Sequence, residues 1–144
     1  MSEAPPARRP SALQLLLLGN LALAAAWAGP GLVAAYWRGR NERTARRALR
    51  AIVVAQEAHA KRAGAPAGLF TLNEAGLLHV WFVDGREHGY ALAVEVDGPR
   101  WSATATPLFL ENGDRAYFVD GTGVILERWP AARRPGPGDP PLGR

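Results

Sequence analysis

Few side chains in this sequence could perform chemistry. The three histidines are His59, His79 and His88, and none stands at the short spacing from another at which two side chains bind one metal ion. The sequence contains no cysteine, which excludes thiolate chemistry and disulfide bonds. Ser11 and Ser102 lie outside any nucleophile-elbow pattern. We therefore predict that the protein is not an enzyme and holds no cofactor and no metal.

Two aspartates near the end of a predicted sheet, Asp114 and Asp120, could offer oxygen ligands to a cation. The oxygen-rich spacing of an established calcium loop is missing around them, and residues 120–123 read Asp-Gly-Thr-Gly, which is typical of a hairpin turn. No glycine-rich sequence follows a strand and opens a helix, so a phosphate cradle is not predicted. Tryptophans could serve as ligand platforms but are more often core residues; those in the C-terminal part are Trp81, Trp101 and Trp129.

The longest uncharged stretch runs over residues 12–37 and contains no acidic side chain, no basic side chain and no histidine. A helix rises about 1.5 Å per residue, so roughly 20 apolar residues cross the hydrocarbon core of a bilayer. The stretch therefore predicts a transmembrane helix over 12–37, after a disordered tail over 1–11. Pro30 predicts a kink in this helix. Aromatic and basic side chains gather where the stretch ends, as they do at a membrane–water interface. The predicted membrane-interface residues are therefore Tyr36, Trp37, Arg38 and Arg40.

A second interpretation of the N-terminus is a secretory signal peptide. Arg8 and Arg9 resemble a positively charged leader, and residues 26–28 read Ala-Trp-Ala, a small-x-small cleavage site that would leave Gly29 as the new terminus. The apolar run continues to residue 37 without a clean break, which favours the anchor.

Residues 38–62 predict a basic amphipathic extension of the same helix, reaching about Ala60. Apolar and small side chains recur there every three or four residues and form one stripe. We predict that this stripe packs on a small sheet through Leu49, Ile52, Val53 and Gln56. The arginines on the other faces are predicted to meet solvent and lipid headgroups rather than nucleic acid.

Residues 63–129 predict a small antiparallel sheet domain. Period-two alternation and turn signals predict about four strands in a meander, near residues 90–96, 101–106, 115–119 and 124–129. Thr71 and Glu74 have the spacing of a capping box, which predicts a helical turn within 71–78. Residues 80–83 fit a short strand or an apolar loop, and the Pro/Gly-rich residues 130–144 predict a disordered tail. The predicted fold class is α+β: a long N-terminal transmembrane helix that continues into a soluble amphipathic helix packed on this sheet.

Three stretches, in this order, resemble type IV pilin-like proteins: AGPGLVAAYWRGRNERTARRALRAIVVAQEAHAK, HGYALAVEVDGPRWSATATP and RAYFVDGTGVILE. The resemblance covers about residues 30–127. It implies a long helix, kinked at proline in its membrane half and packed on a small sheet in its outer half. The sequence departs from the family at its N-terminus. No glycine stands near residues 8–10, where prepilin peptidase would cut, and Leu13 stands about where the family has glutamate.

The resemblance implies a membrane-anchored structural or assembly protein of a cell-envelope pilus or secretion system, acting through helix–helix packing. Its partners would be membrane lipid and other pilin-like subunits or envelope assembly proteins, with no nucleic acid and no small-molecule substrate. The family places the sheet domain outside the cytoplasmic membrane, whereas the arginines after residue 37 outnumber the two before the stretch and favour the opposite topology. We follow the family. The alternative function is a signal-anchored or secreted extracytoplasmic binding module with no filament role.

Overall fold

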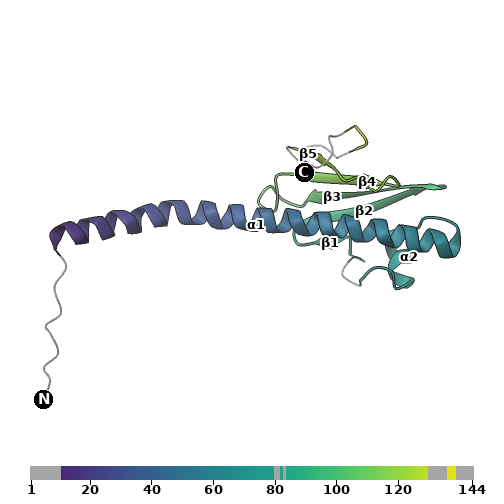
Figure 1. Ribbon diagram of the computed structural model, residues 1–144, viewed down its shortest axis with the longest axis horizontal. Helices are drawn as coiled ribbons and strands as arrows, with labels where there is room; N and C mark the ends of the chain where they lie inside the picture. The colour runs from purple at the N-terminus through teal and green to yellow at the C-terminus, as the bar shows by residue number, and fades with distance from the viewer. Residues whose placement is uncertain (1–10, 80–81, 83, 130–135, 139–144) are drawn as a thin grey trace, which may run out of the picture. The chain divides into compact units, whose positions relative to one another are not determined.

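The computed structural model describes residues 11–79, 82, 84–129 and 136–138 (Figure 1). Most of the two predicted tails and part of residues 80–83 lie outside the described residues. The elements are α1 (Ala12–Ala63), α2 (Leu69–Glu74), β1 (Arg86–Glu87), β2 (Tyr90–Asp97), β3 (Arg100–Pro107), β4 (Ala116–Asp120) and β5 (Leu126–Arg128).

The structure contradicts the prediction of a transmembrane helix over residues 12–37. Among the described residues, no helix combines the length and the apolar character needed to cross a membrane. The apolar stretch is also not a helix of its own, because it is continuous with the arginine-rich residues 38–62 in the single 52-residue helix α1. Pro30 lies inside the bounds of α1, and the kink predicted there stays a prediction.

The chain divides into two compact units, residues 1–35 and residues 36–144. The first unit contains the part of α1 up to Ala35. The second contains the remainder of α1, together with α2 and the whole sheet. All buried apolar residues of the described chain belong to this second unit, which is therefore the folded domain.

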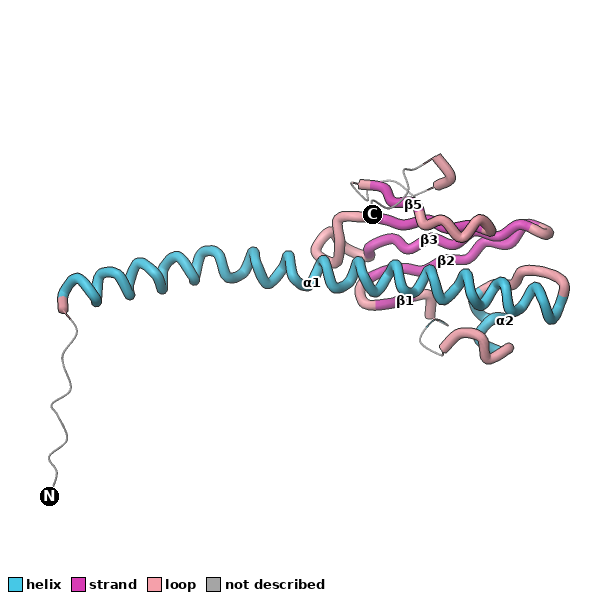
Figure 2. Tube along the Cα trace, in the orientation of Figure 1, coloured by secondary structure: helices cyan, strands magenta, loops and turns pink. Residues whose placement is uncertain are grey.

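The sheet is an antiparallel meander of five strands in the order β1-β2-β3-β4-β5 (Figure 2). The sequence predicted about four. The additional strand β1 has only two residues, and Arg86 pairs with Ala91 across the sheet. The turn between β2 and β3 has Gly98 at its first loop position with φ +55° and Pro99 at its second. A positive φ at the first loop position is what the two-residue hairpin turns require, which explains the glycine.

One face of the sheet packs against the second part of α1, and the two lie side by side in Figure 2. Strand pairing aligns Leu92 with Ala105 and Ala105 with Tyr117, so these residues form one row across β2, β3 and β4. Small residues stand at the centre of both surfaces, with Ala45 on α1 and Ala105 on β3, and both are fully buried. The large buried side chains around them fill the core.

The predicted helical turn exists as α2, but its start differs from the prediction. Helix α2 is preceded by Gly68 as the N-cap residue, which has no side chain to form a capping hydrogen bond. Thr71 and Glu74 therefore lie inside the helix rather than at the ends of a capping box. Leu72 of α2 is fully buried, so this short helix is held by core packing rather than by a side-chain cap.

Candidate functional site

The beginning of the packed part of α1 is joined to the loop between β3 and β4 by three side-chain contacts. Arg38 Nη1 lies 3.4 Å from Asp114 Oδ1, and Asn41 Nδ2 donates to the Asn112 carbonyl oxygen at 3.1 Å. Glu42 Oε1 accepts from the Asp114 backbone N–H at 3.1 Å. This loop is therefore tied to the helix, and Asp114 forms an ion pair with Arg38.

The four predicted membrane-interface residues have different surroundings. Tyr36 and Trp37 are 60% and 49% exposed, with ring centroids 5.8 Å apart in an edge-on arrangement. The Arg40 guanidinium lies 5.2 Å from the centroid of the Trp37 ring, within the range of a cation–π contact. Arg38 is directed to Asp114 instead. Three of the four residues therefore form an exposed aromatic and basic cluster.

The residues predicted for helix–sheet packing also differ in what they contact. Leu49 and Ile52 are fully buried in the core formed by α1 and the sheet. Val53 is partly buried at the edge of this core, and its side chain lies beside Gly123 in the turn between β4 and β5. Gln56 is buried but bonds to the loop after α1: its side-chain amide makes two hydrogen bonds with the backbone of Ala67.

Two tyrosines of the sheet are buried beneath α1, and their roles could not be read from the sequence. The ring centroids of Tyr90 and Tyr117 are 6.2 Å apart, and the Arg46 guanidinium lies 5.9 Å from the Tyr117 ring. Tyr90 donates a hydrogen bond to the Arg115 carbonyl oxygen at 2.8 Å, whereas the Tyr117 hydroxyl has no hydrogen-bond partner among the described residues. Burial raises the pKa of both phenols above its ordinary value of 10, so both keep their protons further into the alkaline range than an exposed tyrosine does.

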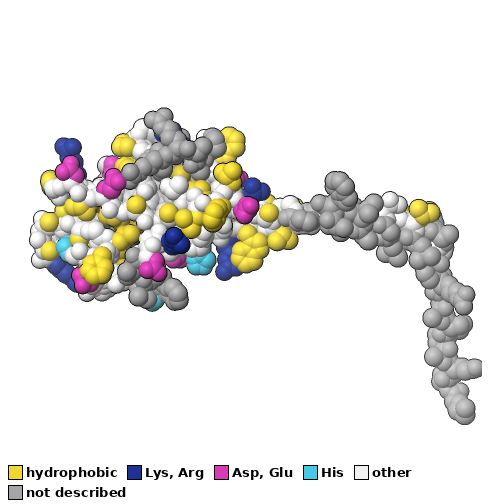
Figure 3. Space-filling model, turned by 180° about the vertical axis from the view of Figure 1, so that it is seen from behind, with side chains coloured by type: hydrophobic (Ala, Val, Ile, Leu, Met, Phe, Trp, Pro, Cys, Tyr) yellow, Lys and Arg dark blue, Asp and Glu magenta, His cyan; other side chains and the backbone are white. Residues whose placement is uncertain are grey.

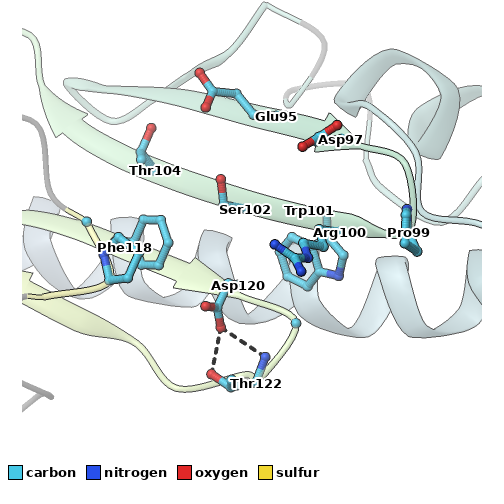
Figure 4. Close-up of a pocket in the computed structure, with 13 residues that line it drawn as sticks. Glu95, Asp97, Pro99, Arg100, Trp101, Ser102, Thr104, Phe118, Asp120 and Thr122 are labelled. Atoms are coloured by element: carbon cyan, nitrogen blue, oxygen red, sulfur yellow. Dashed lines mark hydrogen bonds between the residues drawn. The ribbon is translucent and has the colours of Figure 1, made fainter.

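The face of the sheet that points away from α1 carries an open groove of about 900 Å³. Figure 4 shows side chains of β2, β3 and β4 around it, among them Glu95, Ser102 and Phe118. Gly136 and Pro137 also line the groove. The pairing of Ala93 with Thr104 and of Thr104 with Phe118 puts all three on this face. Thr104 and Phe118 are nonetheless buried. The groove offers carboxylate, hydroxyl and aromatic groups.

Asp120 lies at one edge of this groove, and its carboxylate makes hydrogen bonds within its own turn. Its Oδ1 accepts from the Thr122 backbone N–H at 2.9 Å and from the Thr122 hydroxyl at 2.6 Å (Figure 4). Residues 120–123 therefore form the hairpin turn that the sequence indicates. Among the described residues, no three metal-ligating side chains gather in one place.

The histidines are dispersed as well. His59 Nδ1 lies 2.8 Å from the Ala65 carbonyl oxygen, and His88 Nδ1 lies 2.9 Å from Glu87 Oε1. His79 is exposed. Of the three tryptophans considered above, Trp101 packs against the core, Trp129 is exposed, and Trp81 lies outside the described residues.

Comparison of the chain with protein-family models, with curated proteins and with solved structures finds no match.

Proposed function

We propose that this chain is a pilin-like structural or assembly protein of a cell-envelope pilus or secretion system, which acts by packing the first part of α1 against the same segment of other subunits. The proposal combines the order of elements, a long helix followed by an antiparallel meander sheet, with the resemblance of residues 30–127 to type IV pilin-like proteins. The predicted position of the sheet domain outside the cytoplasm stays a prediction.

The observation that carries the proposal is the exposure of large apolar side chains on residues 12–35. Leu16 is 64% exposed and Leu32 is 70% exposed, and their neighbours Leu17 and Val33 are similarly uncovered. These residues belong to a unit separate from the folded domain, so the core of that domain does not bury them. Exposed apolar side chains on a helix are stabilised when a second helix covers them.

One polar side chain of this segment, Asn20, already makes a hydrogen bond within the helix. Asn20 Nδ2 donates to the Leu16 carbonyl oxygen at 2.9 Å, one turn earlier in α1. Asn20 can therefore face a neighbouring helix with one of its amide N–H groups already paired and its remaining polar atoms available to the partner. Together with the alanines of residues 22–26 and Gly19, it allows close approach of two helices.

The lack of cysteine makes a clean cross-linking experiment possible. In a Leu32→Cys variant of the full chain, mild oxidation should produce covalent dimers, because the same segment of two subunits meets at this position. Phe70→Cys is the matched control: Phe70 is 61% exposed but lies on α2 of the folded domain. Dimers from both variants in equal amounts, or from neither, would contradict the proposal.

A second candidate, an extracytoplasmic binding module, is supported by the groove on the outer face of the sheet. Pro137 lies against this groove, and Trp101 lines it, so a proline-rich peptide is a suitable probe. If the module binds such peptides, the synthetic peptide GPGDPPLGR should change the tryptophan fluorescence of the wild type at micromolar concentration. A Trp101→Phe variant should lose that change. An unchanged spectrum in the wild type would rule out this ligand class.

A further inference from the structure

The solvent-exposed face of α1 in the folded domain carries a regular row of arginines. Exposed residues recur there at alternating spacings of four and three: Tyr36, Arg40, Arg43, Arg47, Arg50 and Val54. At 3.6 residues per turn this spacing puts all six on one face of the helix, over about 27 Å of its axis. The opposite face carries Ala45, Leu49, Ile52 and Gln56, which are buried. We call Arg40, Arg43, Arg47 and Arg50 the arginine row.

The arginine row is not neutralised within the domain. The two arginine–carboxylate pairs within the described part of the chain involve other arginines, Arg38 with Asp114 and Arg115 with Glu127. Glu42 is on the side of α1 that faces the β3–β4 loop, where it accepts from the Asp114 backbone. No member of the arginine row forms an ion pair with a described residue. Four positive charges on one exposed helix face therefore have no ion-pair partner among the described residues, and Glu57, three residues after Val54, is an exposed carboxylate that continues this face.

Two other surfaces of the described domain carry both signs of charge. On the face of the domain seen in Figure 3, acidic and basic side chains are interspersed. The outer face of the sheet also mixes signs, with Glu95 and Asp97 close to Arg100 around the groove. The outer sheet face of a second copy therefore does not offer a surface of opposite sign to the arginine row.

We propose that the arginine row docks the folded domain on an anionic lipid surface, with the axis of this part of α1 parallel to that surface. Guanidinium groups form charge-assisted hydrogen bonds with lipid phosphates, and each basic residue near an anionic leaflet adds to the attraction. This docking is a property of residues 36–63. It does not require that α1 crosses the bilayer or that subunits assemble.

The flanking residues favour lipid over nucleic acid as the anionic partner. Tyr36 and the neighbouring Trp37 are exposed at one end of the row, and Val54 is 65% exposed at the other. Tyrosine and tryptophan prefer the headgroup region of a bilayer, and arginine can keep its charge among headgroups while its aliphatic stem covers apolar surface. Val54 gains from the headgroup boundary but would have no partner on a phosphate backbone.

The experiment measures binding of the full chain to two kinds of vesicle, one of pure phosphatidylcholine and one containing 30% phosphatidylglycerol. The ratio of the two affinities isolates the electrostatic contribution, so any attraction between residues 12–35 and lipid cancels. Wild type should prefer anionic vesicles strongly, and the preference should fall as salt is raised. In the double variant Arg43→Gln/Arg47→Gln, the ratio of the affinity for anionic vesicles to the affinity for neutral vesicles should fall by about fivefold for each arginine removed, or about 25-fold in total.

Arg100→Gln and Arg86→Gln together are the matched control, because both arginines are exposed but lie on the sheet rather than on α1. This control variant should keep most of the wild-type preference for anionic over neutral vesicles. Equal losses in the two double variants would mean that only net charge matters, and would overturn the assignment to the arginine row. A wild type that does not distinguish the two vesicles, or that binds a 20-base-pair DNA duplex in preference to anionic vesicles, would overturn it as well. The Leu32→Cys cross-linking result is independent of all these outcomes.

Discussion

The side-chain amide of Gln56 holds both backbone groups of Ala67. Its Nε2 donates to the Ala67 carbonyl oxygen at 2.6 Å, and its Oε1 accepts from the Ala67 N–H at 2.9 Å. Helix α1 ends at Ala63, so this pair of hydrogen bonds fastens the segment that leads from α1 to α2. Both residues are buried, which means that water cannot take the place of the amide.

Replacing Gln56 with methionine should destabilise the folded domain by about 2–6 kcal/mol. Methionine has nearly the same length and fills the same space, but it leaves a buried N–H and a buried carbonyl of Ala67 unpaired, at about 1–3 kcal/mol for each group. Urea denaturation of the full chain, followed by tryptophan fluorescence, measures the difference in the free energy of unfolding.

The neighbouring substitution Glu57→Gln is the control, because Glu57 is exposed and belongs to the same helix. Its effect should stay within about 0.5 kcal/mol, as for most exposed positions. If Gln56→Met cost no more than this control, the two hydrogen bonds would be unimportant for the fold.

The strands that were predicted most closely are those with regular alternation. β2 and β3 extend over Tyr90–Asp97 and Arg100–Pro107, within one residue of the predicted ends. Alternation along each strand and a two-residue turn fix the register, because a shift by one residue would turn every apolar side chain to the other face. β1 has only two residues, too few for any alternation to show, so the sequence could not reveal it.

The candidate site was predicted only where the contacts follow from helix periodicity. Leu49 and Ile52 lie on one face of α1 in any arrangement of the domain, so the stripe places them correctly without tertiary information. The partner of Gln56 depends on where the chain turns after α1, and the burial of Tyr117 depends on how closely α1 approaches the sheet. Neither can be obtained from spacing along one element.

Tyr90 and Tyr117 offer a comparison between two buried hydroxyl groups with different partners. Tyr90 donates to the Arg115 carbonyl oxygen, whereas Tyr117 has no hydrogen-bond partner in the described part of the chain. Tyr117→Phe removes only an unpaired polar atom, so the free energy of unfolding should stay the same or rise by up to about 1 kcal/mol. Tyr90→Phe should lower it by about 1–2 kcal/mol, because the Arg115 carbonyl loses its donor.

Thermal or urea unfolding of these two variants beside the wild type checks the comparison. Both substitutions delete the same single oxygen from residues that are fully buried, so differences in packing are small. A Tyr117→Phe variant that was clearly less stable than Tyr90→Phe would show that the Tyr117 hydroxyl has a stabilising partner after all.

The same two tyrosines should make the domain sensitive to alkaline pH. Burial is the largest cause of the raised pKa of each phenol, and the carboxylate of Glu42 raises both further. In the unfolded chain each phenol loses its proton near its ordinary pKa of 10, while the folded domain keeps it. The unfolded state then binds fewer protons than the folded state, so stability falls as the pH rises. Below pH 10 both states hold the proton, and this contribution is fully present.

We therefore expect the free energy of unfolding to decrease above about pH 10, with a slope of up to about 1.4 kcal/mol per pH unit for each tyrosine. Urea midpoints measured between pH 8 and pH 11.5 give this slope directly. In the Tyr117→Phe variant, only Tyr90 of the two buried tyrosines still titrates. The part of the pH slope that Tyr90 and Tyr117 contribute to the free energy of unfolding should therefore fall by about half. Tyr36 is exposed, so a Tyr36→Phe variant, which also removes one phenol, should keep the wild-type slope. If Tyr36→Phe reduced the slope as much as Tyr117→Phe does, burial beneath α1 would not be the source of the alkaline sensitivity.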